Sequence, residues 1–348
     1  MAIKRELELR NDELNKEQIE TIYFGGGTPS LLKIDELQML LNTIYENYEV
    51  VEDAEITLEA NPDDLSAKKI KDLAKLPINR LSIGIQSFFD DDLKFMNRAH
   101  TAEESKKCLT EATKYFDNIT IDLIYGVPNM SNEKWLSNLK QAFDFNIPHI
   151  SSYALTVEEK TVLHKLIEKG KVPLVDENLA LEHYNILVEE TEKRGFVNYE
   201  ISNFGHPAYF SKHNTSYWFG EKYLGIGPSA HSFTGFERSW NVSNNTKYIK
   251  ALLVDELPSE KEQLSEINRF NEYIMTGLRT IWGVSFQKIE KEFGAMYLHE
   301  LKKSAERHIK SGLLEIELRT FSGKVLVTTK KGKFLADGIA SDLFKISS

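Results

Sequence analysis

The sequence is poor in cysteine, because its 348 residues contain only one, Cys108. A single thiol excludes an internal disulfide framework and fits a chain that resides in the cytoplasm. It also excludes an iron–sulfur cluster held by several thiolates of this chain alone. Cys108 lies in a charged segment with helical periodicity, and we interpret it as a small, half-buried hydrophobic side chain.

Long apolar runs and an excess of positive charge are also absent. No stretch is long enough to cross a bilayer. The first ten residues, MAIKRELELR, lack the apolar core of a signal peptide. The formal net charge of −10 argues against a general nucleic-acid-binding surface. With 41% hydrophobic and 28% charged residues, the composition is typical of a soluble globular protein.

Runs rich in β-branched residues alternate with runs of helical periodicity through the first half of the chain. The expected strands are Thr21–Phe24, Ala54–Glu59, Leu81–Gln86, Ile119–Tyr125 and His149–Leu155, and the expected helices are Ile34–Glu46, Ser66–Lys75, Ala102–Tyr115, Glu133–Phe143, Val162–Glu168 and Glu177–Arg194. A repeat of roughly 25–35 residues predicts right-handed βαβ units around a parallel sheet. We therefore expect an α/β fold, built as a barrel or partial barrel.

A glycine triplet follows the first expected strand, in the run Tyr23-Phe24-Gly25-Gly26-Gly27-Thr28-Pro29-Ser30. Residues without a Cβ atom allow a ligand to approach the backbone N–H groups closely. The alternative is a tight turn between a strand and a helix. The spacing fits neither a P-loop nor a dinucleotide-binding fingerprint.

Polar side chains interrupt the apolar strands at equivalent places. Glu59, Gln86 and Asp122 stand at or near the carboxyl ends of successive strands, where parallel α/β folds place their ligand-binding groups. Each alone suits a cap or a structural hydrogen bond, but three beside a glycine loop predict a site for a polar ligand. Arg98 follows the third strand and either clamps a carboxylate or pairs with Asp90–Asp92.

The second half of the chain has a different pattern. Residues 201–262 are rich in aromatic side chains, Gly, Ser, Asn and His, with weak periodicity, which is typical of a functional or covering segment. Residues 263–348 return to helices and a hairpin, an order similar to a small winged-helix module. The expected elements are helices Glu266–Thr280, Ser285–Phe293 and Leu298–Ser311, a hairpin of Leu313–Leu318 with Lys324–Thr329, and a last helix Gly332–Ser341. We interpret the basic run at 330–333 as a solvated edge rather than a DNA-binding wing.

The ordered motifs of the whole chain resemble the radical S-adenosylmethionine (SAM) superfamily, and within it the coproporphyrinogen III oxidase-like branch and its HemW heme-chaperone subgroup. These motifs are YFGGGTPSLL, LEANP, GIQSF, NRAH, DLIYGVP, YALT, YEISNF, HNTSYW and GIGPSAHSF, followed by a GLR…GLL module. The resemblance implies a partial (β/α)6 barrel at residues 1–200, a heme-binding connecting segment at 201–262 and a HemN-type C-terminal domain at 263–348.

The resemblance also implies which residues bind SAM. Gly26, Gly27 and Thr28 would contact its amino group and methionine end. Its carboxylate, ribose and neighbouring polar atoms would be held by four side chains: Glu59, Gln86, Arg98 and Asp122. Ala154 and His231 would line the nucleoside side.

One departure from the family is severe. The family carries a C-x-x-x-C-x-x-C motif upstream of the glycine loop, and its thiolates hold a [4Fe–4S] cluster whose electron cleaves SAM. No cysteine precedes Gly25 here. We expect that the first barrel strand and the cluster loop are missing, which would leave a sheet edge open to self-pairing. We also expect that this chain holds no cluster, binds SAM weakly and does not cleave it.

The aromatic segment carries the HNxxYW signature that, by resemblance, distinguishes the heme chaperones from the true oxidases. Its residues are His213, Asn214, Tyr217 and Trp218. A histidine beside flat aromatic surfaces suits a heme, although a structural histidine in an aromatic cover is the alternative. The expected function is a cytoplasmic heme chaperone that passes heme to acceptor proteins of respiration. The alternatives are oxidative decarboxylation of coproporphyrinogen III and a fragment with neither activity.

Overall fold

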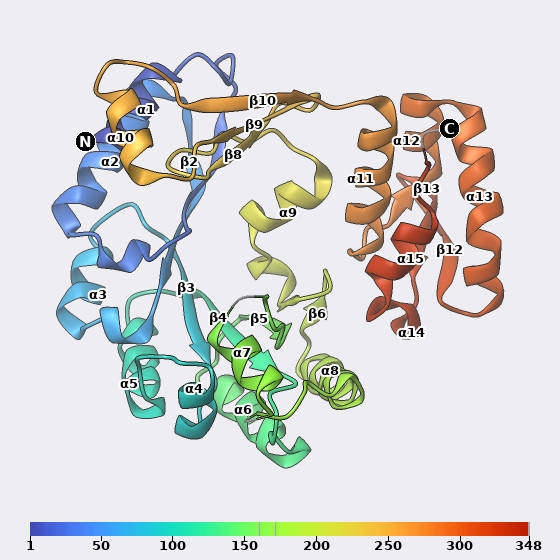
Figure 1. The fold of residues 1–348 in the computed structure, drawn as a ribbon, viewed down its shortest axis with the longest axis horizontal. Helices are drawn as coiled ribbons and strands as arrows, with labels where there is room; N and C mark the ends of the chain where they lie inside the picture. The colour runs from blue at the N-terminus through green and yellow to red at the C-terminus, as the bar shows by residue number, and fades with distance from the viewer. Residues whose placement is uncertain (160, 171, 347–348) are drawn as a thin grey trace. The chain divides into compact units, whose positions relative to one another are not determined.

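The computed structural model describes residues 1–159, 161–170 and 172–346 (Figure 1). Its contacts divide the chain into two compact units. The sheet unit comprises residues 22–34 and 55–210, and the composite unit comprises residues 1–21, 35–54 and 211–348. The composite unit thus joins the first helix of the chain to its whole C-terminal part.

A seven-stranded sheet with the order β1-β2-β3-β4-β5-β7-β6 organises the sheet unit. Its strands are β1 (Ile19–Phe24), β2 (Val50–Ala60), β3 (Arg80–Gln86), β4 (Asn118–Tyr125), β5 (His149–Ala154), β6 (Val197–Asn198) and β7 (Asn203–Gly205). The pairs β2–β3, β3–β4 and β4–β5 are parallel, whereas β7 pairs antiparallel with β5 and β6. All seven residues of β3 are buried, as expected of a central strand covered on both faces.

Helices follow the parallel strands in the expected βαβ order (Figure 1). They are α3 (Ala67–Leu73), α4 (Asp90–Phe95), α5 (Ala102–Ala112), α6 (Asn132–Asp144), α7 (Val162–Glu168) and α8 (Glu177–Glu192). Local sequence sets their starts, since Thr101 and Glu104 form a capping box at α5 and Asp176 caps α8. The fully buried Trp135 joins α6 to α8 by donating its indole N–H to the carbonyl of His183 at 2.9 Å. The predicted α/β architecture is confirmed.

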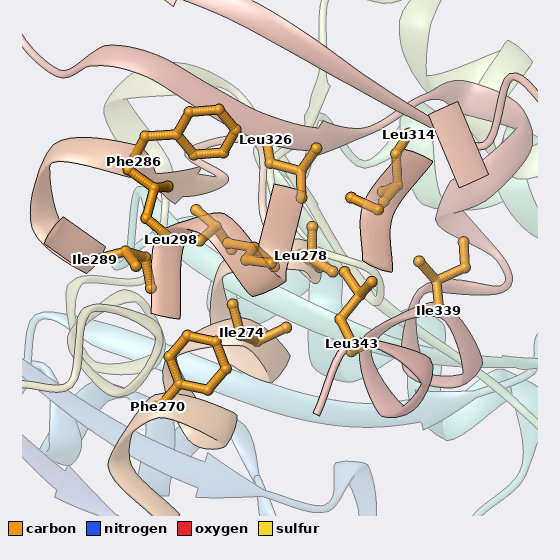
Figure 2. Close-up of a cluster of buried hydrophobic side chains, with 14 of the residues drawn as sticks. Phe270, Ile274, Leu278, Phe286, Ile289, Leu298, Leu314, Leu326, Ile339 and Leu343 are labelled. Carbon is orange, nitrogen blue, oxygen red and sulfur yellow. The ribbon is translucent and has the colours of Figure 1, made fainter. Parts of the chain in front are cut away.

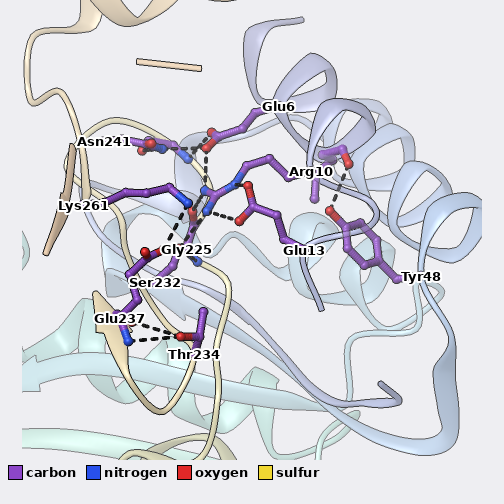
Figure 3. Close-up of polar contacts among 12 residues, drawn as sticks. Glu6, Arg10, Glu13, Tyr48, Gly225, Ser232, Thr234, Glu237, Asn241 and Lys261 are labelled. Carbon is purple, nitrogen blue, oxygen red and sulfur yellow. Dashed lines mark hydrogen bonds and ion pairs between the residues drawn. The ribbon is translucent and has the colours of Figure 1, made fainter. Parts of the chain in front are cut away.

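The part of the composite unit that precedes residue 264 is held together by a buried carboxylate. The helices here are α1 (Ala2–Leu9), α2 (Ile34–Asn47), α9 (Lys212–Phe219) and α10 (Asn245–Leu252), and an antiparallel sheet pairs β10 (Ser259–Gln263), β9 (Glu237–Asn241) and β8 (His231–Phe233) in that order. Glu6 of α1 is fully buried and accepts hydrogen bonds from Arg10 (3.0 Å), Asn241 (2.6 Å) and the backbone N–H of Gly227 (2.8 Å) (Figure 3). Arg10 also donates to the carbonyl of Gly225 at 2.8 Å, so this ion pair fixes the loop that leads into β8.

The C-terminal part of the composite unit has its own apolar core. It contains α11 (Glu266–Leu278), α12 (Phe286–Phe293), α13 (Ala295–Lys310), α14 (Lys330–Lys333) and α15 (Ala336–Asp342), with an antiparallel sheet in the order β11 (Val284–Ser285), β13 (Gly323–Thr328) and β12 (Leu314–Arg319). Phe270, Ile274, Ile289 and Leu326 point into this core from α11, α12 and β13 (Figure 2). The three expected helices and the hairpin are confirmed. The expected last helix is instead two short helices, because Phe334 and Leu335 separate α14 from α15.

None of the helices in the described parts of the chain combines the length and the apolar character needed to cross a membrane.

Candidate functional site

The glycine loop after β1 presents open backbone. Gly26 and Gly27 are exposed and have φ angles of +70° and +60°, and a Cβ atom at either position would meet no atom within 4 Å. The space above this loop is therefore free for a ligand, while the left-handed conformation favours glycine. Thr28 follows as a half-buried residue, and Pro29 opens a single 3₁₀ turn, Pro29–Leu31, rather than the longer helix α2.

Glu59, near the end of β2, ties its carboxylate to this loop. One oxygen accepts the Tyr23 hydroxyl at 2.7 Å, and the other accepts the backbone N–H of Gly26 at 3.2 Å. Removal from water, together with the Glu59 charge, raises the pKa of Tyr23 above its usual value, so the phenol stays a donor. The predicted neighbourhood of Glu59 and Gly26 is therefore present in the structure.

The ends of the Gln86 and Arg98 side chains both lie next to Gly84, near the end of β3. A Cβ atom on Gly84 would lie 2.9 Å from Nε2 of Gln86 and 3.0 Å from Nη2 of Arg98, with Oδ1 of Asn61 at 3.7 Å. Gln86 itself has a φ of +65°, where the register between β3 and β4 shifts. The strand thus bends at the point where its amide side chain leaves the sheet, a feature typical of functional sites.

Arg98 is directed to the strand ends rather than to the acidic start of α4. That acidic cluster has another cation, since Lys134 forms ion pairs with Asp91 at 2.7 Å and with Asp92 at 2.6 Å. Of the two interpretations of Arg98, the structure favours a guanidinium presented at the sheet end.

Asp122 of β4 lies opposite Ser151 of β5 and is half-buried. Removal from water raises the pKa of Asp122 to about 7, and the negative charge of Glu59 adds to this effect. Two cations, Arg80 and Arg98, oppose the shift. The two carboxylates therefore influence one another electrostatically and share one end of the sheet, as the strand pattern predicts.

The remaining two predicted SAM residues lie in different units. Ala154 ends β5, is half-buried and pairs with Tyr125 of β4. His231 begins β8 in the composite unit, where it is exposed and its ring lies 6.1 Å from that of Trp240. Seven of the nine residues thus lie near the ends of β1–β4, with Ala154 on the neighbouring strand. The SAM-binding roles of all nine stay predictions.

The thiol chemistry of this chain does not fit an iron–sulfur cluster. Cys108 is 3% exposed on α5, and burial raises the pKa of its thiol to about 12, so the thiolate that a metal needs is disfavoured. Nor do the described residues bring together three or more His, Cys, Asp or Glu side chains at metal-binding spacing.

The HNxxYW signature forms α9, a helix that the weak periodicity did not predict. Ser211 caps its start by accepting the N–H of Asn214, and Gly220 ends it with a φ of +72°. The two signature residues one turn apart, His213 and Tyr217, pack edge to face with ring centroids 5.0 Å apart. Nδ1 of His213 shares a hydrogen bond of 2.9 Å with Oγ1 of Thr21.

Tyr217 extends this aromatic packing to Tyr223, at 4.6 Å between ring centroids. Both tyrosines and Trp218 line a cavity of about 390 Å³ within the composite unit. The indole nitrogen of Trp218 is buried and has no hydrogen-bond partner among the residues that the structure describes. Tyr217 and Trp218 therefore line the cavity, and His213 contacts it only through the ring of Tyr217. Asn214 contributes its backbone N–H to the helix cap.

Some residues at both sites carry no local sequence signal. Tyr23 and Asn61 belong to the YFGGGTPSLL and LEANP motifs, yet only the folded chain shows that Tyr23 binds Glu59 and that Asn61 lies beside Gly84. Thr21 is separated from its partner His213 by 192 positions. Side chains of a β-strand alternate between its two faces, so Thr21 and Tyr23 of β1 lie on the same face. This alternation is the one sequence signal that relates these two residues.

Comparison with known proteins identifies the family. The Radical SAM superfamily model matches residues 3–142, and the HemN C-terminal domain model matches residues 264–335. The chain is 37% identical to the heme chaperone HemW of Lactococcus lactis, over 80% of this chain and 73% of that protein. It is 32% identical to the heme chaperone HemW of Bacillus subtilis, over 97% of this chain and 90% of that protein.

A solved structure extends the match to the fold. The coproporphyrinogen III oxidase HemN of Escherichia coli aligns with a TM-score of 0.83, covering 99% of this chain and 82% of that one. At 21% identity this likeness shows the fold alone. The sequence relatives decide the narrower assignment: the chain belongs to the HemW family within the radical SAM superfamily.

Proposed function

We propose that this chain is a heme chaperone, which binds heme and passes it to acceptor proteins. Relatives at 31–37% identity from several bacteria carry that name. The observation on which the proposal rests is the arrangement on α9, where an imidazole is held by Thr21 against the ring of Tyr217, beside an aromatic-lined cavity. An imidazole next to flat apolar surface is the chemistry that an iron porphyrin needs.

Each group at this site has a separate task in the proposal. The hydrogen bond between Thr21 and His213 orients the imidazole, and donation of the Nδ1–H to Oγ1 of Thr21 would leave Nε2 free to bind iron. Tyr217 restricts the imidazole from one side by edge-to-face packing. The aromatic walls then replace water around the macrocycle, which favours burial of its apolar faces.

The sheet unit has side chains that fit SAM. Gly26 and Gly27 offer open backbone, Glu59 and Asp122 are acceptors for an ammonium or a ribose, and Arg98 is a cation for the carboxylate. When bound with a cluster, SAM supplies radical chemistry in the family. With its single cysteine, this chain would hold SAM weakly and without cleavage. Anaerobic iron–sulfur reconstitution followed by an assay for 5′-deoxyadenosine tests this, and stoichiometric cluster or turnover would refute it.

The alternative function, oxidation of coproporphyrinogen III, has weaker support, because HemN of Escherichia coli is only 21% identical and the HemN C-terminal domain model covers only residues 264–335. We further propose delivery to heme proteins of respiration and a cytoplasmic location, both by the family resemblance. Self-association remains a prediction from the sequence.

Titration with hemin, followed by its Soret absorbance, tests the proposal. We compare the wild type with His213→Ala and with Thr21→Val, which keeps the imidazole but removes its hydrogen bond. His299→Ala is the matched control, because His299 is exposed on α13 in the same unit. Loss of an axial ligand should weaken binding by at least about tenfold, which is about 1.4 kcal/mol. Thr21→Val should give a smaller loss, and His299→Ala none.

Equal binding by the wild type and His213→Ala would move the heme site away from α9. A wild type that binds no hemin would contradict the chaperone assignment and favour an inactive fragment. Formation of protoporphyrinogen from coproporphyrinogen III would favour the oxidase.

A further inference from the structure

The cavity beside α9 is bounded by elements that lie far apart in the sequence. Its walls come from α9, from the β8–β9 hairpin and from α11 and α12, all within the composite unit. Seven aromatic residues line it: Tyr217, Trp218, Phe219, Tyr223, Phe233, Tyr273 and Phe293. With a volume of about 390 Å³, it lies in the lower part of the range of about 300–1,000 Å³ that small-molecule pockets occupy. The cavity suits one edge of a flat, largely apolar ligand.

Two hydrogen-bond donors of this lining have no acceptor. Nε1 of Trp218 and Nε of Arg269 are both buried, and neither has a hydrogen-bond partner among the described residues. A buried donor left without an acceptor costs about 1–3 kcal/mol, so native proteins rarely leave two in one place. A ligand acceptor that reaches these two donors would remove this cost.

The charge on Arg269 narrows the kind of acceptor. The guanidinium lies over the rings of Phe236 (5.0 Å) and Phe293 (5.9 Å), which hold it in place without neutralising it. Two other cations line the cavity. Arg238 already forms an ion pair of 2.9 Å with Glu272, and the ammonium of Lys288 lies 4.6 Å from the centre of the Tyr273 ring. Arg269 is thus the guanidinium of the lining that can still form a bidentate pair with a carboxylate of a ligand.

The carboxylates that line the cavity do not pair with the guanidinium of Arg269 among the described residues. Glu221 and Glu292 also line the cavity, but both side chains are exposed and belong to its solvated rim. Glu272 is committed to Arg238. The inner surface therefore combines aromatic walls with donors that lack a counter-charge.

We propose that this cavity binds the propionate edge of heme, with Arg269 and the Trp218 indole N–H as donors to its carboxylates. The inference rests on the proposed chaperone function and extends it. Tyr217 connects the two parts, because its ring lines the cavity and packs on His213. Arg269 belongs to α11, within the segment that matches the HemN C-terminal domain. This domain would therefore contribute to heme binding.

The test compares hemin with hemin dimethyl ester, which has the same iron and ring but no free carboxylates. The variants are Arg269→Met, Arg269→Lys and Trp218→Phe, which removes only the indole N–H donor while keeping an aromatic ring. Arg307→Met is the matched control, since Arg307 is an exposed arginine of α13 that pairs with Asp342. Circular dichroism and thermal unfolding establish that each variant is folded.

We expect the wild type to bind hemin about 10–100-fold more tightly than the dimethyl ester, as charge-assisted hydrogen bonds imply. Arg269→Met should bind the two ligands equally, Trp218→Phe should lose part of the preference, and Arg307→Met should keep it. Arg269→Lys should keep part of the preference, because it retains the charge without the Nε donor.

Other outcomes separate this inference from the chaperone proposal. Equal wild-type affinity for both ligands would overturn the cavity assignment while leaving heme binding intact. A preference that persists in Arg269→Met would place carboxylate recognition elsewhere and also overturn it. Absence of any hemin binding by the wild type would overturn both proposals.

Discussion

Replacement of Asp122 by asparagine should stabilise the protein at neutral and alkaline pH. Asp122 shares the end of the sheet with Glu59, and its pKa is raised from 3.8 to about 7 by removal from water and by the Glu59 charge. The folded state therefore holds a proton that the unfolded chain releases at a lower pH. Ionisation of Asp122 in the folded state costs free energy that the neutral amide of asparagine does not incur.

The sign and size of the effect follow from proton linkage. A carboxyl whose pKa is higher in the folded state leaves stability unaffected below pH ~3.8, lowers it increasingly between pH ~3.8 and 7, and lowers it by a constant amount above pH 7. A shift of about three units at 1.36 kcal/mol per unit gives an upper limit of about 4 kcal/mol. Between pH 5 and pH 8 the advantage of Asp122→Asn should grow by about 1–3 kcal/mol, a range that allows for partial contact of the carboxyl with solvent.

Urea unfolding at pH 5, 6.5 and 8 measures this difference directly. Asp117→Asn is the control, because Asp117 is exposed just before β4, and its difference from the wild type should not change with pH. Glu59→Gln should make the wild-type profile shallower by removing the neighbouring charge. If Asp122→Asn is less stable than the wild type, or if the difference is the same at pH 5 and 8, the proposed electrostatic coupling at the sheet end is wrong.

Three further predictions concern other parts of the fold. Glu6→Ala should destabilise the chain by about 3–5 kcal/mol in urea unfolding, because it removes one of the two carboxylates that pair with the buried Arg10 and the shared acceptor of Asn241, Tyr248 and the Gly227 N–H; a loss below 1 kcal/mol would contradict the network in Figure 3. Leu326→Ala should cost about 2–5 kcal/mol and lower the midpoint of thermal unfolding, since Leu326 is fully buried in the core of Figure 2; an unchanged midpoint would show that this core is not formed. Cys108 should react with a thiol reagent only as fast as the native protein opens, because its thiol is buried and its pKa is raised to about 12; rapid labelling under native conditions would place it at the surface.

The sequence predicted the sheet end well because its signal is local. Glu59, Gln86 and Asp122 interrupt apolar strands, and parallel strands bring their carboxyl ends to one edge whatever the details of packing. In the structure, Glu59 accepts a hydrogen bond from Gly26, and Gln86 and Arg98 both lie beside Gly84. The strand pattern does not predict the direction in which the Arg98 side chain points. That direction depends on Lys134, which forms the ion pairs with Asp91 and Asp92 at the start of α4.

The composite unit was harder to predict because long-range contacts determine it. α9 is amphipathic only weakly by sequence, and it is fixed by the caps at Ser211 and Gly220 and by the contact of His213 with Thr21. The β8–β10 sheet falls in the same segment of weak periodicity. Its entry loop depends on Glu6, more than 200 positions away, so no local window reveals it.

A crystal structure of the chain with hemin would show directly where the heme and its propionates bind. We expect a heme whose iron is bound by the imidazole of His213 and whose propionates accept hydrogen bonds from Arg269 in the cavity beside α9. A heme seated away from α9, with His213 still turned to Thr21 and the cavity empty, would contradict it.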